Sequence, residues 1–246
     1  MDNQKTVIEI KDLKKSYGVN HVLNGFNMYL VEGENLVIMG KSGSGKSVMI
    51  KCLIGLEKPE SGSIIVMGKD IGTLEHEELD ELRTEVGFLF QGSALYDSMT
   101  VRENLEFPLR RHTKKFGVIK DTTPLVMEAL ENVGLAHTVN LMPEELSGGM
   151  KRRVALARTL ILQPRIILYD EPTTGLDPIT AKEILLLMQS IQKKYNTSSI
   201  IITHDVDCAR AISNRMILLV DGINYAEGTF EELIASNDPQ IQAFFK

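Results

Sequence analysis

The sequence of 246 residues contains little cysteine and no long apolar run, and these absences exclude several classes of protein. Its two cysteines, Cys52 and Cys208, stand far apart, so one disulfide is conceivable but a disulfide framework is not. Two free thiols in a reducing compartment is the interpretation we favour. The apolar stretches at Ile161–Tyr169 and Met216–Val220 are far too short to span a bilayer, which argues against a transmembrane helix.

The sequence also has fewer basic than acidic residues. The 27 basic residues are outnumbered by 33 acidic ones, for a net charge of −6, whereas a nonspecific nucleic-acid binder normally carries a basic surplus. We therefore expect no nucleic-acid partner. Residues Met1–Ile10 are polar and charged without an apolar core, so no signal peptide is expected there. Together these features predict a cytoplasmic protein, unless a partner holds it at a membrane.

The order of strand and helix signals predicts an α/β fold. Short runs of branched apolar residues predict strands at Val7–Ile10, Leu36–Met39, Ile166–Tyr169 and Ser199–Ile202. The last two are continuously apolar, as expected for a parallel sheet covered on both faces. Helical spacing predicts helices at Ser47–Leu56, Pro124–Leu135, Met150–Leu162 and Ala181–Tyr195. Asp221-Gly222 predicts a hairpin that joins Met216–Val220 to Ile223–Ala226.

No repeat, low-complexity tract or long linker divides the chain. We expect a single domain whose core comprises residues 1–92 and 163–236 and includes a small N-terminal antiparallel β-subdomain. A helical subdomain over 93–162 is inserted in it, and 237–246 form a C-terminal extension. The expected buried stripe of the helical part consists of Leu125, Leu130, Val133 and Leu135, with Met127 near them.

A glycine-rich loop lies between the strand at Leu36–Met39 and the next helix. Its residues are Gly40, Lys41, Ser42, Gly43, Ser44, Gly45, Lys46 and Ser47, and they fit the P-loop pattern G-x-x-x-x-G-K-[ST] in full. Glycines let backbone N–H groups turn inward around phosphates, and the helix that follows adds its positive end. Lys46 is expected to reach the β- and γ-phosphates of ATP, and the Ser47 hydroxyl to ligate Mg²⁺. The alternative is an ordinary Gly/Ser turn before a helix.

Two adjacent acids follow the apolar strand at Ile166–Tyr169. Asp170 and Glu171 at a strand end are costly together unless a cation or a reaction uses them. Asp170 is the candidate for Mg²⁺, and Glu171 is the candidate for orienting and polarising the attacking water. An exposed strand end that carries acids is common in α/β proteins, so this pair alone decides little. With the loop it predicts a P-loop NTPase.

A second phosphate-binding segment narrows this prediction. Leu146-Ser147-Gly148-Gly149-Met150 stands directly before a helical run, and Ser-Gly-Gly at a helix N-terminus favours an anion by the same physics as the P-loop. The alternative is a plain helix cap. The pentapeptide resembles the LSGGQ-like signature of the ABC ATPase family. In that family the signature contacts ATP held by the P-loop of a second subunit, so the resemblance implies a homodimer with shared active sites.

The resemblance covers nearly the whole chain and assigns further expected roles. Tyr17 falls where the family stacks an aromatic ring on adenine, although a strand-edge tyrosine is the plainer alternative. Gln91 matches the glutamine that approaches the metal, and Asp177 matches the intersubunit aspartate. His204 matches the histidine that touches the γ-phosphate. Met150 departs from the family pattern, because methionine cannot make the hydrogen bonds of the usual glutamine.

The resemblance also implies a cargo. A single cassette without spans or sustained heptads implies a separate membrane permease, which is expected to contact the region after Gln91. The segments Gly92–Asn104 and Asp177–Thr180, with Met150, look like those of Mla/MCE-type phospholipid transport ATPases. That group implies an MCE-domain partner and a place on the cytoplasmic face of the inner membrane. ATPases for amino acids or lipoproteins, or a soluble ABC ATPase that acts on nucleic acid, stay open as alternatives.

The C-terminal residues Ile241, Phe244 and Phe245 are spaced to share one helical face. That face either packs on the chain's own core or contacts a partner subunit.

Overall fold

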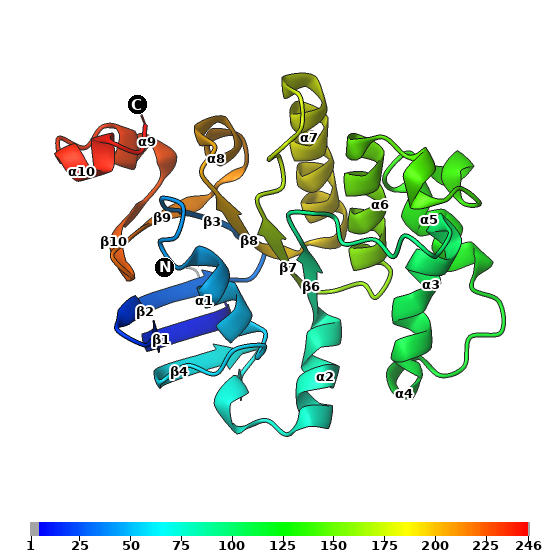
Figure 1. Cartoon of the computed structure of the whole chain (residues 1–246), viewed down its shortest axis with the longest axis horizontal. Coiled ribbons are helices and arrows are strands. Elements are labelled where there is room, and N and C mark those ends of the chain that lie inside the picture. Colours follow the sequence, from blue (N-terminus) through cyan, green and yellow to red (C-terminus); the bar gives the residue numbers. More distant parts are fainter. Residues whose placement is uncertain (1–4, 246) are drawn as a thin grey trace. The chain divides into compact units, whose positions relative to one another are not determined.

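The computed structural model describes residues 5–245, which form two compact units (Figure 1). The first unit contains the residues up to Asp80 together with those from Asn196 onward, and the second contains Glu81–Tyr195. Residues 81–92 and 163–195, which the sequence analysis assigns to the core, group with the helical region. The reason is that β6 (Val86–Leu89) pairs with β7 (Ile166–Asp170) and packs on α6 (Gly148–Leu160).

An antiparallel sheet opens the first unit. Its strands β1 (Thr6–Tyr17), β2 (Asn20–Val31), β4 (Ser61–Val66) and β5 (Lys69–Asp70) follow the order β2-β1-β4-β5. β1 and β2 are twelve residues each, much longer than the run that predicted the sheet, because several register shifts bend them without ending the pairing. The tight turn between them contains Gly18, whose positive φ of 61° suits glycine.

The other strands of the first unit carry the expected parallel pairing. β3 (Asn35–Met39) lies parallel to both β8 (Ser198–Thr203) and β9 (Arg215–Val220), and all side chains of β3 and β8 are buried. β10 (Ile223–Gly228) pairs antiparallel with β9, which confirms the predicted hairpin. The remaining elements of this unit are α1 (Lys46–Leu53), the 3₁₀ turn η1 (Ile71–Thr73), α8 (Val206–Ile212), α9 (Phe230–Ile234) and α10 (Pro239–Gln242).

In the second unit, helices surround one hydrophobic core. α2 (His76–Glu85) enters it and is followed by β6; the remaining elements are α3 (Val101–Arg111), α4 (Thr113–Phe116), α5 (Thr123–Glu131), η2 (Ala136–Thr138), η3 (Pro143–Glu145), α6, β7 and α7 (Pro178–Tyr195). Of the predicted stripe, Leu130, Val133 and Leu135 are buried and Leu125 packs against the cluster. Met127, expected near the stripe, is half-buried. Val126 is also fully buried in this cluster, because positions 126 and 130 share one face of α5.

Cys52 and Cys208 form no disulfide, and both are fully buried. Burial raises the pKa of the Cys52 thiol to about 11. We expect a thiol-reactive dye at pH 8 to label neither cysteine in the native protein and to label both in denaturant, because the thiolate is the reacting form. Rapid labelling of either native thiol contradicts this prediction.

Among the helices of residues 5–245, none is long and apolar enough to cross a bilayer.

Candidate active site

The loop from Gly40 to Ser47 connects β3 to α1 in the first unit. Gly43 and Gly45 have φ values of +80° and +102°, a region that side chains rarely adopt. A Cβ atom on Gly45 would lie 2.8 Å from the carbonyl oxygen of Val22. Both backbone conformation and close approach therefore require glycine at position 45.

The loop is built to receive an anion. Lys46 is buried, and its ammonium donates to the carbonyl oxygens of Gly40 (2.6 Å) and Lys41 (3.0 Å), so its side chain folds back across the loop. The buried Ser44 hydroxyl has no hydrogen-bond partner. No side chain caps the start of α1, which leaves its first N–H groups for a ligand. These features fit a polyphosphate.

His204 leaves the sheet at the same edge as this loop. β3 and β8 run parallel with Met39 opposite Thr203, so Gly40 and His204 both follow the carboxyl ends of paired strands. The next residue, Asp205, accepts hydrogen bonds from the N–H groups of Asp207 (2.9 Å) and Cys208 (3.2 Å) and so caps α8. Ligands commonly bind at this edge of α/β sheets.

Tyr17 stands at the end of β1, opposite Asn20 of β2. Its side chain is 47% exposed, and the Lys15 ammonium lies 5.1 Å from the ring centroid. Partial burial, followed by a hydrogen bond to Glu57, raises the pKa of the Tyr17 hydroxyl. An aromatic ring this exposed is available for stacking on a base.

In the second unit, the carboxyl ends of β6 and β7 lie side by side. Leu89 pairs with Tyr169, so Gln91 and Asp170 emerge at one edge. Glu171 is almost fully buried and adopts a left-handed φ of +50°, which is strained for a non-glycine residue. Its carboxylate accepts a hydrogen bond from the Thr174 hydroxyl at 3.0 Å, which fixes the side chain's direction.

The signature loop, Leu146–Met150, begins α6. The Ser147 hydroxyl accepts a hydrogen bond from the Met150 N–H at 3.2 Å and caps the helix. A Cβ on Gly148 would meet open space, whereas one on Gly149 would lie 2.6 Å from Thr180 Cγ2. The close approach of the helix start to Thr180 therefore requires glycine at position 149.

Asp177 is hydrogen-bonded to Thr180, the residue that Gly149 approaches. Its carboxylate accepts hydrogen bonds from the Thr180 hydroxyl (2.6 Å), the Thr180 N–H (3.0 Å) and the Ile179 N–H (3.1 Å). These bonds, the Thr180 hydroxyl first, lower the pKa of Asp177. Thr180 thus links the turn at Gly149 to Asp177, and the paired ends of β6 and β7 place Gln91 and Asp170 at one edge of their strands.

Comparison with known proteins decides which family this chain belongs to. A family model described as "ABC transporter" matches residues 23–174. The chain belongs to the ABC transporter family. It is an ATP-binding subunit of that family and an ATPase, as sequence analysis predicts.

Several ABC proteins resemble this chain along most of its length. It is 42% identical to the "probable ribonucleotide transport ATP-binding protein mkl" of Mycobacterium leprae, over 96% of this chain and 68% of that protein. It is 39% identical to the "intermembrane phospholipid transport system ATP-binding protein MlaF" of Haemophilus influenzae, over 98% and 91% respectively. Identity is 38% to the "methionine import ATP-binding protein MetN" of Brucella abortus, over 94% and 62%.

A solved structure supports the fold. The ATP-binding cassette MJ0796, in a dimeric post-hydrolysis state bound to ADP and Pi, superposes with a TM-score of 0.82 at 33% identity. The match covers 91% of this chain and 98% of that one. The predicted P-loop α/β fold is therefore confirmed.

Met150, the departure from the signature of ABC ATPases, has a packing role. It is partly buried against the hydrophobic core of the second unit, which contains Leu146 and Val154 of the same segment. An amide side chain there would lose this apolar contact. The methionine is therefore explained by the helical core.

Two arginines that the sequence analysis missed join α6 of this ABC ATPase to the loop around Gln91. Arg152 donates to the carbonyl oxygens of Phe90 (2.7 Å) and Thr174 (3.4 Å). Arg158 donates to those of Ala94 (2.7 Å) and Ser93 (3.2 Å), and these two loop residues have left-handed φ values of 48° and 63°. The signature helix thus holds the backbone on either side of Gln91.

Arg152 is almost fully buried, and burial lowers its pKa while Asp170 counteracts that shift. We expect Arg152→Ala to lower the free energy of unfolding by about 2–3 kcal/mol, because the carbonyls of Phe90 and Thr174 lose a charged donor that is itself buried. Urea denaturation measures this. Arg153→Ala is the matched control: Arg153 pairs with the exposed Glu183 and makes one long bond (3.4 Å) to the Val133 carbonyl, so its loss is expected to cost only about 1 kcal/mol. Equal losses for the two variants contradict the assigned role of Arg152.

Ser47 in the first unit and Asp170 in the second each carry a kind of oxygen ligand that Mg²⁺ uses beside a nucleotide. Among the described residues, no group of three or more His, Cys, Asp or Glu side chains forms a metal site. Mg²⁺ in P-loop ATPases is held by a hydroxyl, a carboxylate, phosphates and water instead of a protein cage. Ser47 is exposed at the start of α1, and Asp170 is half-buried at the end of β7.

Proposed function

We propose that this chain is the ATPase of a phospholipid transporter of the Mla/MCE type, at the cytoplasmic face of the inner membrane. The observation that carries the proposal is the likeness to MlaF, which extends over 98% of this chain and 91% of that protein. The matches to mkl and MetN leave about a third or more of those proteins unmatched. Identity alone does not separate these relatives; the segments Gly92–Asn104 and Asp177–Thr180, with Met150, resemble those of Mla/MCE-type ATPases and favour the phospholipid system.

The chemistry is assigned to the two loops and the strand ends. Lys46 and the loop N–H groups bind the phosphates, Tyr17 stacks on adenine, and Ser47 with Asp170 and Gln91 holds Mg²⁺, which neutralises phosphate charge when bound. Glu171 accepts a proton from the attacking water, and His204 stabilises the γ-phosphate. The strained, hydrogen-bonded carboxylate of Glu171 supports this role.

The signature loop completes the site of a second copy. Ser147, Gly148 and Gly149 at the start of α6 are a second candidate phosphate-binding segment in a chain whose P-loop already serves one nucleotide, which favours a homodimer with two shared sites. The dimeric MJ0796 cassette supports this arrangement. ATP closes the dimer, and hydrolysis releases it and resets the membrane subunits.

A groove after Gln91 suits the permease. It has a volume of about 440 Å³ and its lining includes Phe88, Phe90, Tyr96 and Phe107. The last three are 38–42% exposed, which is unusual for aromatic rings and typical of a protein interface. Tyr96 and Phe107 pack at 4.8 Å. An amphipathic helix of a permease fits such a groove.

Buried Asn104 shapes the rim of this groove. Its amide donates to the carbonyls of Tyr96, Met99 and Thr100 at 3.0–3.1 Å and accepts from the Tyr96 N–H at 2.8 Å. Thr100 and Glu103 form a capping box that starts α3. The loop is thus held in a defined shape, as docking requires.

The test is to purify the tagged chain in detergent from the membranes of its own organism. We expect a permease, an MCE-domain protein and phospholipid to co-purify. A permease with an amino-acid-binding protein would instead favour an importer like that of MetN. Recovery without any membrane protein, with ATPase activity stimulated by DNA or RNA, would reject transport.

Permease docking is tested separately with Phe107→Ala. We expect this variant to lose the permease while keeping ATP binding. Leu186→Ala, which removes another exposed apolar side chain of the same unit, is the control and should keep the permease. Equal recovery with both variants would reject the groove as the docking site.

A further inference from the structure

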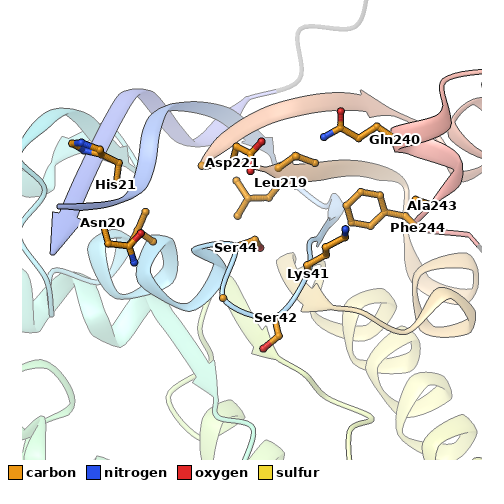
Figure 2. A pocket seen from close by; sticks show the side chains of 14 residues that line it. Asn20, His21, Lys41, Ser42, Ser44, Leu219, Asp221, Gln240, Ala243 and Phe244 are labelled. Carbon is orange, nitrogen blue, oxygen red and sulfur yellow. The ribbon is translucent and has the colours of Figure 1, made fainter. Parts of the chain in front are cut away.

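A cavity of about 530 Å³ flanks the P-loop in the first unit (Figure 2). One wall is the P-loop stretch 41–44, and another is the start of β2 at Asn20–Val22, directly opposite Tyr17. The hairpin residues 219–222 close a third side. Its size and its mixture of polar and apolar walls suit a nucleoside-sized ligand.

The remaining wall comes from the far end of the chain. Gln240, Ala243 and Phe244 line the cavity, although they lie about 200 residues after the P-loop in sequence. Figure 2 shows the Phe244 ring directed toward the P-loop, with the Lys41 side chain extended toward that ring, while the Gln240 amide lies nearer the hairpin at Leu219 and Asp221. An ammonium near an aromatic face is favourable.

The C-terminal segment, Asp238–Phe245, is held in this position from its opposite side. Gln242 donates to the carbonyls of Ile234 (2.7 Å) and Ser236 (2.8 Å), and the Tyr225 hydroxyl donates to Asp238 at 2.8 Å. The Phe245 ring packs edge-on against Phe230 at 5.5 Å. These bonds fix the segment on its own unit.

The single apolar face expected for Ile241, Phe244 and Phe245 does not form. α10 ends at Gln242, so the two phenylalanines leave in different directions. Ile241 is 8% exposed and Phe245 packs on Phe230, while Phe244 lines the cavity. Two of the three side chains thus anchor the segment and the third faces the P-loop.

We infer that the C-terminal segment is a wall of the nucleotide site, in which Phe244 and Gln240 contact the nucleoside part of bound ATP. The inference rests on the proposed placement of the phosphates at the P-loop. With the base on Tyr17 and the phosphates at Lys46, the sugar lies beside the cavity at Val22 and residues 41–44. An aromatic ring and an amide there supply a flat apolar contact and a hydrogen-bonding group for a hydroxyl.

The test measures binding, by titration calorimetry without Mg²⁺, of ATP and of inorganic triphosphate. We expect Phe244→Ala to weaken ATP binding about three- to tenfold and to leave triphosphate binding unchanged, because only ATP has the nucleoside. Gln240→Ala is expected to act in the same direction. Ile234→Ala is the control, since it removes a similarly exposed apolar side chain of the same region outside the cavity.

Each other outcome has a definite meaning. Unchanged ATP affinity in both Phe244→Ala and Gln240→Ala overturns the inference. An equal loss of ATP and triphosphate binding also overturns it, because the segment then acts on the phosphate loop alone. Lys46→Ala, titrated in parallel, tests the position of the phosphates separately from the contact of the C-terminal segment with the nucleoside. If this variant keeps full affinity for both ligands, the phosphates do not bind at the P-loop.

Discussion

Replacing Glu171 with glutamine is expected to lower ATP turnover about 10²- to 10⁴-fold while leaving ATP binding intact. The substitution keeps the size of the side chain and its hydrogen bond with Thr174, but removes the group that accepts a proton from water. Because hydrolysis is what reopens the proposed dimer, the variant is expected to accumulate as an ATP-bound dimer. Phosphate release measures turnover, and light scattering with and without ATP measures the dimer.

The matched control for this prediction is Glu128→Gln, which removes an exposed carboxylate from α5 of the same unit. Its turnover should equal that of the parent chain. Unaltered hydrolysis in Glu171→Gln would show that Glu171 is not the base. Lost ATP binding in that variant would show that it shapes the site in addition to acting on water.

Lys46→Ala is expected to weaken ATP affinity roughly 10- to 100-fold, since a hydrogen bond from a charged donor contributes about 1.5–3 kcal/mol. The ammonium folds back on the carbonyls of Gly40 and Lys41, so it already lies within the loop that is assigned to the phosphates. Turnover at saturating ATP is expected to fall too, because the same charge stabilises the transferring phosphoryl group. Calorimetric titration with ATP gives the affinity.

Lys51→Ala serves as its control. Lys51 is an exposed lysine in the last turn of the same helix, so the variant removes the same charge from α1 without touching the loop. ATP affinity equal to that of the parent is the expected result. If Lys51→Ala and Lys46→Ala lose affinity equally, the effect is one of general charge, and the placement of phosphates at the P-loop fails.

Most of the candidate site was predictable because its signals are local. The P-loop, the acids after β7 and the signature loop each lie within about eight consecutive residues, where glycine conformation, strand ends and helix starts are decided by neighbouring residues. The strands at β3, β7, β8 and the terminal hairpin were predicted for the same reason. β6 was missed because four residues give too short a pattern, and the burial of Val126 was missed because only the packed core shows which side of α5 faces inward.

By itself the sequence determined that this chain is an ABC ATPase, since the phosphate-binding segments carry their chemistry in contiguous residues. Only the tertiary structure decided which distant residues contact those segments. Arg152 contacts Phe90, 62 positions away, and Phe244 lies beside the P-loop, about 200 positions away. The packing of Met150 depends on which side chains fill the helical core. Such contacts arise from packing and from the pairing of buried polar groups, and no local pattern encodes them.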